Sequence, residues 1–408
     1  MKTTMVIPSY WARESRVGWR EGDAVFDHPT PVDYDGTLLR AIQSINILDD
    51  KDFQLVIIAV ATSPDIEKDV EEKVKGIISS AGVDIEALLF SHSHLMQIHQ
   101  LLSSKDKERY NPLLQLDGYS NIRNLCVFLP HILGSEIAVL IDDDEVFEDS
   151  AFMNKAGEFI GQRFFGSVVD AVAGYYLQPD GDYRLKAEFL PWTAYWGQSE
   201  AMNQAFDEVI AAKPRLKETP FVFGGNMIIH RDLFRVVPFD PNVPRGEDID
   251  YLMNARMFGF KFFLDSELSI RHLPPPKTHP AWQRLRMDIF RFLFEKAKLD
   301  TQIPISNMDM VSPEDFDPYP GRFLKADLED KIYRSNLMLA LDYLSKGDKT
   351  GCEEALNNIS LSKLFVKNHP DPFGNLLRLQ KSWQEMMAYT ERKDVLLKMS
   401  EIIKEGQE

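Results

Sequence analysis

The stretch EIAVLIDDDEVFED, residues 136–149, sets an apolar run directly against four consecutive acids. Its first half has the length and composition of a buried strand, and residues 142–145 follow it at once. Neighbouring carboxylates repel one another unless a positive charge lies among them. A helix N-cap would account for one acid, such as Asp149, but not for the whole run. The pattern therefore predicts a strand that ends at a site for a hard divalent cation, Mn²⁺ or Mg²⁺.

The length and composition are those of an ordinary globular protein. A chain of 408 residues can form two or three domains, and 44% hydrophobic with 27% charged residues argues against disorder. The net charge of −17 excludes a general nucleic-acid binder, which needs a basic face. Because Cys126 and Cys352 are the only cysteines, no disulfide framework is expected. The apolar runs are too short for a signal peptide or a membrane span, so we expect a cytoplasmic protein.

Apolar runs alternate with helical patterns through the first half of the chain. Such alternation predicts an α/β fold with a mostly parallel sheet and helices on both faces. In sheets of this kind, ligands bind beyond the carboxyl ends of the strands, where residues 142–145 lie. After residue 300 the chain reads as mainly helical. The expected strands are 3–8, 53–62, 87–90 and 136–141, and the expected helices are 37–48, 65–82 and 119–134.

A second informative stretch, VPRGEDIDYLMNARMFGFKFFLDSELSIRHLPPP, covers residues 243–276. Glu247 and Asp248 open a helix there, where acids stabilise the helix dipole. A carboxylate in that position can also act as a general base. His272 follows a predicted strand and precedes three prolines. A lone histidine is more often structural than a ligand, but a neutral imidazole is a common added ligand where carboxylates already hold a metal.

A competing acidic motif lies earlier in the chain. VDYDGTLL, residues 32–39, matches the Asp-x-Asp-Gly-Thr signature of haloacid-dehalogenase-like phosphatases. In that chemistry the first aspartate is a nucleophile at the end of a buried strand. The preceding FDHPTP holds two prolines and a histidine, which do not suit a central strand. A phosphatase is therefore kept only as a distant third alternative.

The order of motifs along the chain resembles that of GT-A glycosyltransferases, above all the large family-2-like group. The motifs are, in order, MVIPSYW, DGTLLRAIQSI, SNIRN, AVLIDDDEVF, FGGNMIIHRDLF, RGEDIDYLMNARMFGFKFFLD and RH. The resemblance covers about residues 3–275. It implies a GT-A fold, with a mixed, mostly parallel sheet flanked by helices and a helical C-terminal extension. The catalytic domain would span residues 1–278 and the mainly helical region 279–408. The nucleotide-binding half would cover about 1–150 and the acceptor half about 151–278.

The same resemblance implies roles for single residues. Asp142 would contact the nucleotide side and share a metal ion with Asp144 and His272. Asp248 would deprotonate the acceptor hydroxyl in an inverting reaction, slightly favoured over a retaining one, and Glu247 would help to bind acceptor or sugar. The residues implied in binding the nucleotide sugar are Pro8, Ser9, Tyr10, Thr62, Arg123, Asp142, Asp143, Gly224, Gly225 and Asn226.

The implied function is that of a metal-dependent transferase of the hexosyltransferase class. It would move a sugar from a nucleotide-diphosphate sugar to a hydroxyl of a carbohydrate, lipid-linked or small-molecule acceptor, with Mn²⁺ or Mg²⁺ as cofactor. An alternative from another class is a catalytically silent relative that binds a nucleotide sugar or a carbohydrate. No nucleic-acid partner is expected, and a homo-oligomer stays open.

Two features depart from the family pattern. The second strand ends in AVATSPD, without an acid until Asp65, where members of the family use acids to hold the base. A loop of residues 11–36 separates the first strand from its helix and is long enough to bring Arg13, Arg16 or Arg20 to phosphates or acceptor. The sequence therefore leaves the identity of the base open.

Aromatic and basic segments suggest further contacts. In LPWTAYWGQ, residues 190–198, Trp192 and Trp196 form either a stacking platform for the acceptor or part of the core. HPAWQRLRMDIFRFLFEKAKL, residues 279–299, predicts a basic amphipathic helix. We favour its packing on its own domain over peripheral contact with an anionic membrane.

Overall fold

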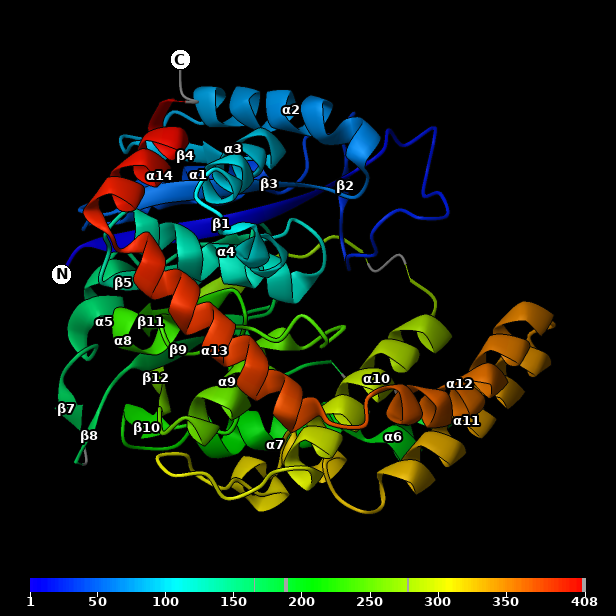
Figure 1. Cartoon of the computed structure of the whole chain (residues 1–408). Coiled ribbons are helices and arrows are strands. Elements are labelled where there is room, and N and C mark those ends of the chain that lie inside the picture. The colour runs from blue at the N-terminus through cyan, green and yellow to red at the C-terminus, as the bar shows by residue number, and fades with distance from the viewer. Residues whose placement is uncertain (165, 187–189, 277–278, 406–408) are drawn as a thin grey trace.

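In the computed structural model, residues 1–164, 166–186, 190–276 and 279–405 are described, and one large sheet runs through them (Figure 1). Its central strands are buried on both faces, as their nearly continuous apolar sequences require. The strands are β1 Thr3–Ala12, β2 Thr30–Pro31, β3 Gln54–Ala61, β4 Ala87–Phe90, β5 Ile137–Ile141, β6 Glu145–Val146, β7 Arg163–Phe164, β8 Ser167–Val168, β9 Ala171–Leu177, β10 Leu216–Glu218, β11 Asn226–His230 and β12 Phe262–His272.

The main sheet has the strand order β10-β12-β9-β11-β5-β1-β3-β4. β4, β3, β1 and β5 run parallel, and β9 and β12 are parallel to each other. β11 lies between β5 and β9 and is antiparallel to both. The carboxyl ends of β1, β3, β5, β9 and β12 therefore lie at one edge of the sheet, together with the start of β11. This edge is called the carboxyl edge below, and the sheet is mixed and mostly parallel, as predicted.

Helices cover both faces of the sheet because strand residues alternate between two cores. Met5 and Ile7 pack with α1, α2 and α5, whereas Val6 packs with α3, α4, α7 and α9. The helices are α1 Leu38–Ser44, α2 Glu67–Ser80, α3 His92–Ser103, α4 Tyr119–Ile132, α5 Phe152–Glu158, α6 Pro191–Trp196, α7 Gln198–Val209, α8 Arg231–Phe234, α9 Glu247–Met257, α10 Ala281–Asp300, α11 Leu328–Ser345, α12 Lys349–Asn368, α13 Pro372–Thr390 and α14 Lys393–Glu405.

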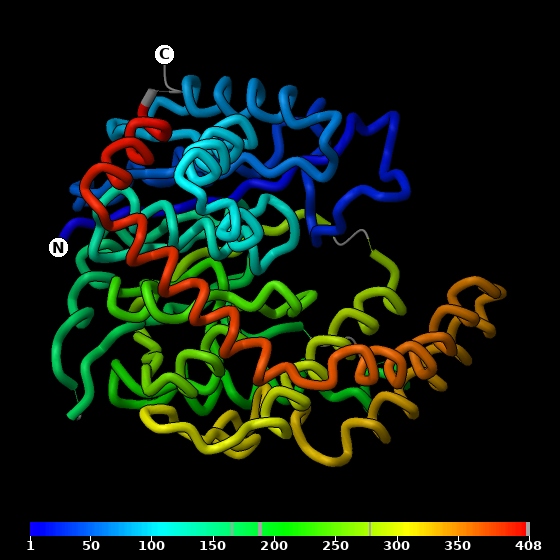
Figure 2. The backbone as a smooth tube through the Cα atoms, viewed as in Figure 1, coloured from blue at the N-terminus to red at the C-terminus, as the bar shows by residue number. Residues whose placement is uncertain are grey.

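The last two helices return to the N-terminal half of the chain. Figure 2 follows α13 along the molecule and α14 back to the region of β4 and α3, which α14 contacts. Trp383 of α13 is fully buried, and its indole Nε1 donates a hydrogen bond to the carbonyl oxygen of Phe234 at 2.8 Å. The helices after residue 279 thus share a core with the sheet, while the predicted division of the chain at residue 278 stays a prediction from sequence.

Helix α10 packs inside the protein. Its apolar face is buried, Arg286 pairs with Glu354 of α12, and Lys298 pairs with Asp250 of α9 at 2.6 Å. This is the packing that the sequence favoured, and it leaves no broad amphipathic face on α10 for a membrane surface. Within the described residues, no helix is both long and apolar enough to cross a membrane.

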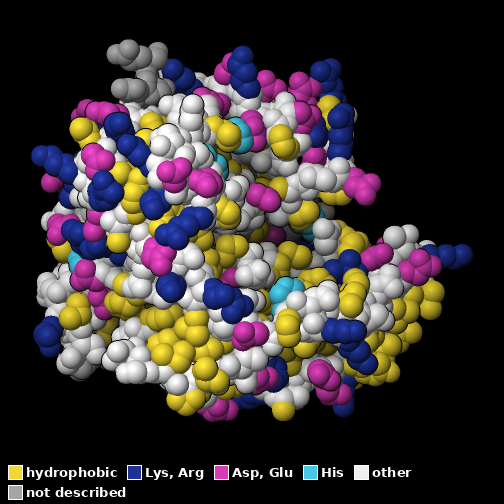
Figure 3. Space-filling view, viewed as in Figure 1, with side chains coloured by type: hydrophobic (Ala, Val, Ile, Leu, Met, Phe, Trp, Pro, Cys, Tyr) yellow, Lys and Arg dark blue, Asp and Glu magenta, His cyan; other side chains and the backbone are white. Residues whose placement is uncertain are grey.

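The paired helices α11 and α12 extend from the body as an arm, in orange in Figure 1. Buried amides connect the pair, since Asn358 of α12 donates to Asn336 of α11 at 2.8 Å. Figure 3 shows the surface hollowed between this arm and the N-terminal half. Helix α10 joins the arm to the body beside this hollow, so the C-terminal region helps to form its wall.

Candidate functional site

The predicted acidic run lies at the carboxyl edge, directly after β5. Strand β5 is entirely buried, and a tight turn then brings the N–H of Glu145 to the carbonyl oxygen of Asp142 at 3.3 Å. The turn leads into β6, which pairs antiparallel with the end of β12. Four acids are therefore held by backbone hydrogen bonds at the centre of the sheet rather than in a free loop.

Asp144 lies beside His272, although the two are far apart in the sequence. The pairing of β6 with β12 sets Glu145 opposite His272, and the N–H of Leu273 donates to the carbonyl oxygen of Asp144 at 2.9 Å. As a result, Nε2 of His272 is 3.3 Å from Oδ2 of Asp144. Burial alone would raise the pKa of Asp144, but the contact with His272 outweighs it and the pKa is lowered. Nδ1 of His272 is buried without a hydrogen-bond partner among the described residues.

Arg123 of α4 occupies the space between two buried acids. Its Nη2 is 2.8 Å from Oδ1 of Asp142, and its Nε is 3.3 Å from Oε1 of Glu247. Arg123 is only 4% exposed, and Nη1 has no partner among the described residues. Burial raises the pKa of Asp142, and the charge of Arg123 opposes that rise. Asp142 thus faces Arg123, and within the described residues it does not join Asp144 and His272 in a compact three-ligand group.

Burial raises the pKa of each of the remaining two acids of the run. Asp143 accepts a hydrogen bond from the Ser9 hydroxyl at 2.6 Å, yet burial and the charge of Asp144 raise its pKa to about 8. Glu145 is fully buried, and burial together with Asp142 places its pKa well above the usual range. Its carboxylate accepts the N–H of Asp142 at 3.0 Å. Glu145 therefore helps to shape the turn between β5 and β6.

Gly224 and Gly225 let the backbone before β11 approach these acids. A Cβ atom on Gly225 would lie 2.7 Å from Cγ of Asp142, and one on Gly224 would lie 2.8 Å from Nη2 of Arg123. Neither distance is tolerable for a side chain, so glycine is required at both positions for this close approach. Asn226 follows, with its amide donating to the carbonyl oxygen of Leu268 at 3.1 Å.

Tyr176 is a residue of the site that the sequence did not single out. Its ring stacks on the imidazole of His272 with centroids 4.7 Å apart, and its hydroxyl accepts the N–H of Gly225 at 2.8 Å. Tyr176 lies one residue before the end of β9, opposite Ile270 of the parallel neighbour β12, and His272 ends β12, so the register brings the two rings near each other. The sequence did not show which strand would be the neighbour of β9.

Glu247 and Asp248 begin helix α9 at the same edge. Gly246 precedes them with φ +72°, a left-handed conformation that suits glycine. The N–H of Gly224 donates to Oδ2 of Asp248 at 3.1 Å, which fixes the carboxylate beside the glycine turn. Burial, and next the charge of Asp248, raise the pKa of Glu247 to about 7. Arg291 of α10 packs over Gly246 so closely that a Cβ atom on Gly246 would collide with its guanidinium group.

The predicted nucleotide side is covered by part of the 11–36 loop. Phe26 is buried against Tyr10 and Tyr119, with ring centroids 4.5 Å and 5.1 Å away. The N–H of Ala24 donates to the carbonyl oxygen of Thr62 at 2.8 Å. The hydroxyl of Tyr10 and the hydroxyl of Thr62 are both buried without a partner among the described residues. Pro8 and Ser9 lie in β1 just before this cluster.

Two arginines of this loop, Arg13 and Arg16, have partners other than a ligand. Arg13 pairs with Asp23 at 2.9 Å and also contacts Asp65, so it joins the ends of β1 and β3 to the loop. Arg16 pairs with Glu14. Phosphate binding by Arg13 would require it to leave two carboxylates.

The two tryptophans have different surroundings. Trp196 is 4% exposed and packs against Phe292 and Phe323, with ring centroids 5.9 Å and 5.1 Å away. This is core packing, the second of the two readings of the sequence, and it leaves no open ring face for stacking. Trp192 is partly buried, and its Nε1 has no hydrogen-bond partner among the described residues. Trp192 is therefore the better placed of the pair for contact with an acceptor.

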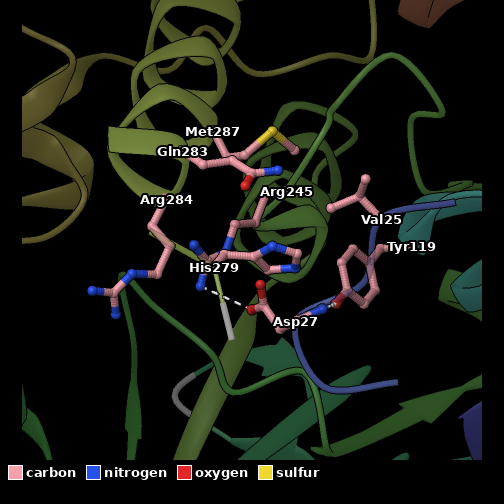
Figure 4. Close-up of a pocket in the computed structure, with 8 residues that line it drawn as sticks. All are labelled: Val25, Asp27, Tyr119, Arg245, His279, Gln283, Arg284 and Met287. Carbon is pink, nitrogen blue, oxygen red and sulfur yellow. Dashed lines mark hydrogen bonds and ion pairs between the residues drawn. The ribbon is translucent and has the colours of Figure 1, made fainter. Parts of the chain in front are cut away.

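A small pocket opens next to the start of α9 (Figure 4). Its walls come from the 11–36 loop, from α4, from the segment before α9 and from α10. In Figure 4, Arg245 points toward Asp27, and the two pair at 2.9 Å. Arg284 has no ion pair or side-chain hydrogen bond within the described residues, and its Nε is buried. The lining residues are Val25, Asp27, Tyr119, Arg245, His279, Gln283, Arg284 and Met287.

The motif at residues 32–39 is in a different setting from a phosphatase nucleophile. Asp33 and Asp35 are exposed, and Asp33 accepts the N–H of Ser15 at 2.7 Å. The strand before them, β2, has two residues and pairs only with the end of β1. No buried strand leads into Asp33, which agrees with the low rank given to that alternative.

A second group of ligand-type side chains lies at the opposite edge of the sheet. Ligand atoms of Asp170, His230 and Asp232 all lie within 4.8 Å of one another. Their spacing in the sequence, with the first two sixty positions apart, gave no signal of this grouping. It is distinct from the acids that follow β5.

A scan against protein-family models finds no match for this sequence, and a search of curated proteins finds no similar chain. Among solved structures, a mannosyltransferase from Pyrobaculum calidifontis in complex with GDP-Man and Mn²⁺ matches with TM-score 0.45 and 13% identity, over 96% of this chain and 87% of that one. GalNAc-T7 with UDP, GalNAc and Mn²⁺ matches with TM-score 0.38 and 11% identity, over 73% and 51%. A mycobacterial protein matches with TM-score 0.38 and 16% identity, over 72% of each chain. The match to the mannosyltransferase covers most of this chain.

Proposed function

We propose that the protein is a metal-dependent glycosyltransferase that moves a sugar from a nucleotide-diphosphate sugar to an acceptor hydroxyl. The observation that carries this proposal is the contact of Asp144 with His272 at the carboxyl edge, 3.3 Å apart and next to Asp142 and Arg123. One carboxylate oxygen and one imidazole nitrogen suit Mn²⁺ or Mg²⁺ when substrate phosphates complete the coordination.

The donor atoms present fit a divalent ion. Asp144 and His272 would hold it, and Asp142, which faces Arg123, stays a predicted further ligand. When bound, the ion would neutralise negative charge on the leaving diphosphate. The partly buried imidazole is fixed in orientation by the ring of Tyr176, and Tyr176 is itself fixed by its hydrogen bond with the N–H of Gly225. Such a supported ligand costs little further ordering when it binds an ion.

Arg123 supplies a positive charge for binding the donor, and this charge does not depend on a metal ion. Its unpartnered Nη1 is buried beside Asp142, so it can donate to an oxygen of the nucleotide sugar. Gly224 and Gly225 have no side chains to fill the space beside Asp142, which would leave room there for the transferred sugar. We therefore assign Arg123, Asp142 and the two glycines to donor binding.

Asp248 is the proposed general base. The N–H of Gly224 and the N–H of Ile249 each donate to one of its carboxylate oxygens, at 3.1 Å and 2.9 Å. The carboxylate is thereby held at the start of α9, three residues after Arg245, which lines the pocket of Figure 4. The acceptor hydroxyl would give its proton to Asp248, which suits an inverting reaction. The acceptor itself would lie in this pocket, within reach of Arg245, His279 and Gln283.

One observation favours the alternative of a catalytically silent binding relative. Phe26 covers Tyr10, and Ala24 is bonded to Thr62, so the expected nucleotide side is partly filled by the chain itself. In an active enzyme, residues 24–26 would have to sit beside the base or move when it binds. A relative without activity would need no such change.

Two measurements test the proposal. Thermal unfolding with Mn²⁺ and each of UDP, GDP, ADP and TDP should show stabilisation by one nucleotide only when the metal is present. The matching sugar nucleotides are then assayed for hydrolysis and transfer. Nucleotide binding without any turnover across sugars and acceptors would favour the silent relative. Absence of metal-dependent nucleotide binding would remove the proposal.

The variant Asp144→Asn tests the proposed metal ligand, because it removes the charge of the side chain and keeps its shape. It should lose the metal-dependent stabilisation by nucleotide. Asp149→Asn changes an acid at the end of the same segment, outside the proposed site, and should leave that stabilisation unchanged.

A further inference from the structure

We propose that Asp170, His230 and Asp232 bind one divalent transition-metal ion, Zn²⁺ or Mn²⁺, at the edge of the sheet opposite the carboxyl edge. This ion would have a structural role and would be separate from the ion of the proposed catalytic site. The inference does not depend on the proposed function, because it concerns other residues and can be tested by metal binding alone.

The strand pairing brings the three side chains together. Asp170 directly precedes β9, His230 ends β11, and Asp232 lies in the first turn of α8. In the β9–β11 ladder Ile229 faces Ala171, and the N–H of His230 donates to the carbonyl oxygen of Asp170 at 2.8 Å. The ligand atoms of the three residues therefore converge to within 4.8 Å of one another, each from a different element. Convergence of this kind is the geometry of a three-ligand protein site.

The carboxylate of Asp170 has no partner among the described residues. Asp170 is 9% exposed, and no hydrogen bond or ion pair to its carboxylate is found there. Arg231, which begins α8, and Arg235, which follows α8, both pair with Glu391 just after α13. An ionised carboxylate that is largely buried and left unpaired is unfavourable. A cation between Asp170 and its two neighbours would relieve this cost.

The imidazole of His230 points to the same conclusion. Its Nδ1 accepts the N–H of Asp232 at 3.3 Å, so Nδ1 carries a lone pair rather than a proton. Oδ2 of Asp232 lies 3.4 Å from that same nitrogen. A lone pair and a carboxylate oxygen repel each other at this distance unless a proton or a metal ion lies between them. A metal ion that replaces the N–H of Asp232 at Nδ1 would serve Nδ1, Asp232 and Asp170 together, whereas one proton serves only one of these contacts.

The donor set determines the class of ion. One imidazole nitrogen and two carboxylate oxygens favour Zn²⁺ or Mn²⁺ over Ca²⁺ and Mg²⁺, which prefer oxygen alone. Asp232 is largely exposed, so water can fill the remaining positions. Bound there, the ion would join the start of β9 to the end of β11 and to α8, and the folded state would gain stability from binding.

The test measures metal binding in the absence of any nucleotide. The full-length protein, freed of metal by a chelator, is titrated with ZnCl₂ and separately with MnCl₂ by calorimetry, and its thermal unfolding is followed at the same metal concentrations. The wild type should bind one equivalent and unfold at a higher temperature with metal. Asp170→Asn and His230→Gln should each weaken binding at least about tenfold, which is the loss expected when a ligand or its support is removed.

Two control variants separate this site from the proposed catalytic site. Asp144→Asn should still bind one equivalent of metal in the absence of nucleotide. Glu200→Gln, which changes an exposed acid on α7, should behave as wild type. Circular dichroism without metal checks that each variant is folded. If Asp144→Asn abolishes the binding and Asp170→Asn does not, the ion belongs to the carboxyl edge and the inference fails. If the folded wild type binds no Zn²⁺ or Mn²⁺ at all, the inference also fails. Neither result bears on nucleotide binding, so the proposed function would stand.

Discussion

The two ends of strand β11 place acidic side chains in opposite situations. At the start of β11, Asp142 lies 2.8 Å from Arg123, and Asp144 lies 3.3 Å from His272. At its end, Asp170 has no cation or hydrogen-bond donor on its carboxylate in the part of the chain that the structure describes. The first edge holds the guanidinium group of Arg123 in a fixed position beside its acids, which suits binding of a charged substrate. At the second edge Asp232 has the imidazole of His230 at 3.4 Å, and Asp170 has no cation among the described residues, which suits a bound ion with a structural role.

The sharpest way to break this comparison is to remove one acid from each end. Asp144→Ala should reduce metal-dependent sugar transfer below detection, because the proposed ion would lose its carboxylate ligand. Asp170→Asn should leave the rate of transfer unchanged, since it lies at the opposite edge. Initial rates with saturating Mn²⁺ and the cognate donor measure both. Equal losses in the two variants would show that the edges are not independent.

Asp248→Asn isolates the proposed base from the donor site. Transfer should fall by about 10²–10⁴-fold, the usual contribution of a general base. Binding of the nucleotide with Mn²⁺ should stay within about threefold of wild type, because Arg123, Asp144 and His272 are untouched. Calorimetric titration together with single-turnover rates separates the two effects. A variant that turns over normally would exclude Asp248 as the base.

Arg123→Met makes the carboxyl edge resemble the other end of β11. The substitution keeps an apolar stem but leaves Asp142 and Glu247 buried without their cation. Breaking a buried pair in this way should lower the free energy of unfolding by about 3–5 kcal/mol. Urea unfolding at neutral pH measures the change. If stability is unaltered, the acids must already be neutral in the wild type, and the charge assignment at this edge is wrong.

The smallest expected effect is a change in pH dependence at Glu247. Its pKa in the folded protein is about 7, above the usual 4.5, because of burial and the charge of Asp248. The folded state therefore binds more protons than the unfolded state between these values, so this group's contribution to stability is present at low pH and is lost as pH rises through 7. Glu247→Gln should remove that loss. Unfolding midpoints of both proteins at pH 5 and pH 8 test it, and parallel changes would contradict the assigned pKa.

Much of the fold was predicted from local patterns. The four expected strands correspond to β1, β3, β4 and β5, and the three expected helices correspond to α1, α2 and α4. Burial on one or both faces determines the spacing of apolar residues in each segment, so the pattern can be recognised within the segment itself. Helix α3 was not predicted. Its histidine-rich start, HSHLMQIHQLL, hides the apolar period that buries Leu95 and Ile98.

The parts of the candidate site that were predicted are those whose functional residues are adjacent in the sequence. The acids after β5, the glycines before β11 and the acids that start α9 all lie at the carboxyl edge, as expected. Tyr176, which stacks on His272, was missed because a tyrosine at a strand end carries no signal until its neighbour is known. The contacts of Phe26 with Tyr10 and of Arg13 with Asp65 were missed for the same reason, since a long loop has no period from which to infer its position.

The sequence by itself determined which segments form buried strands and that acids must follow β5, because apolar period and charge repulsion act between near neighbours. Only the tertiary structure decided which acids receive a cation. Arg123, His272 and the ring of Tyr176 reach the carboxyl edge through strand order and register, and the same pairing gathers Asp170, His230 and Asp232 at the other edge. Electrostatic energy depends on distance in space, and that distance is fixed only when the sheet closes.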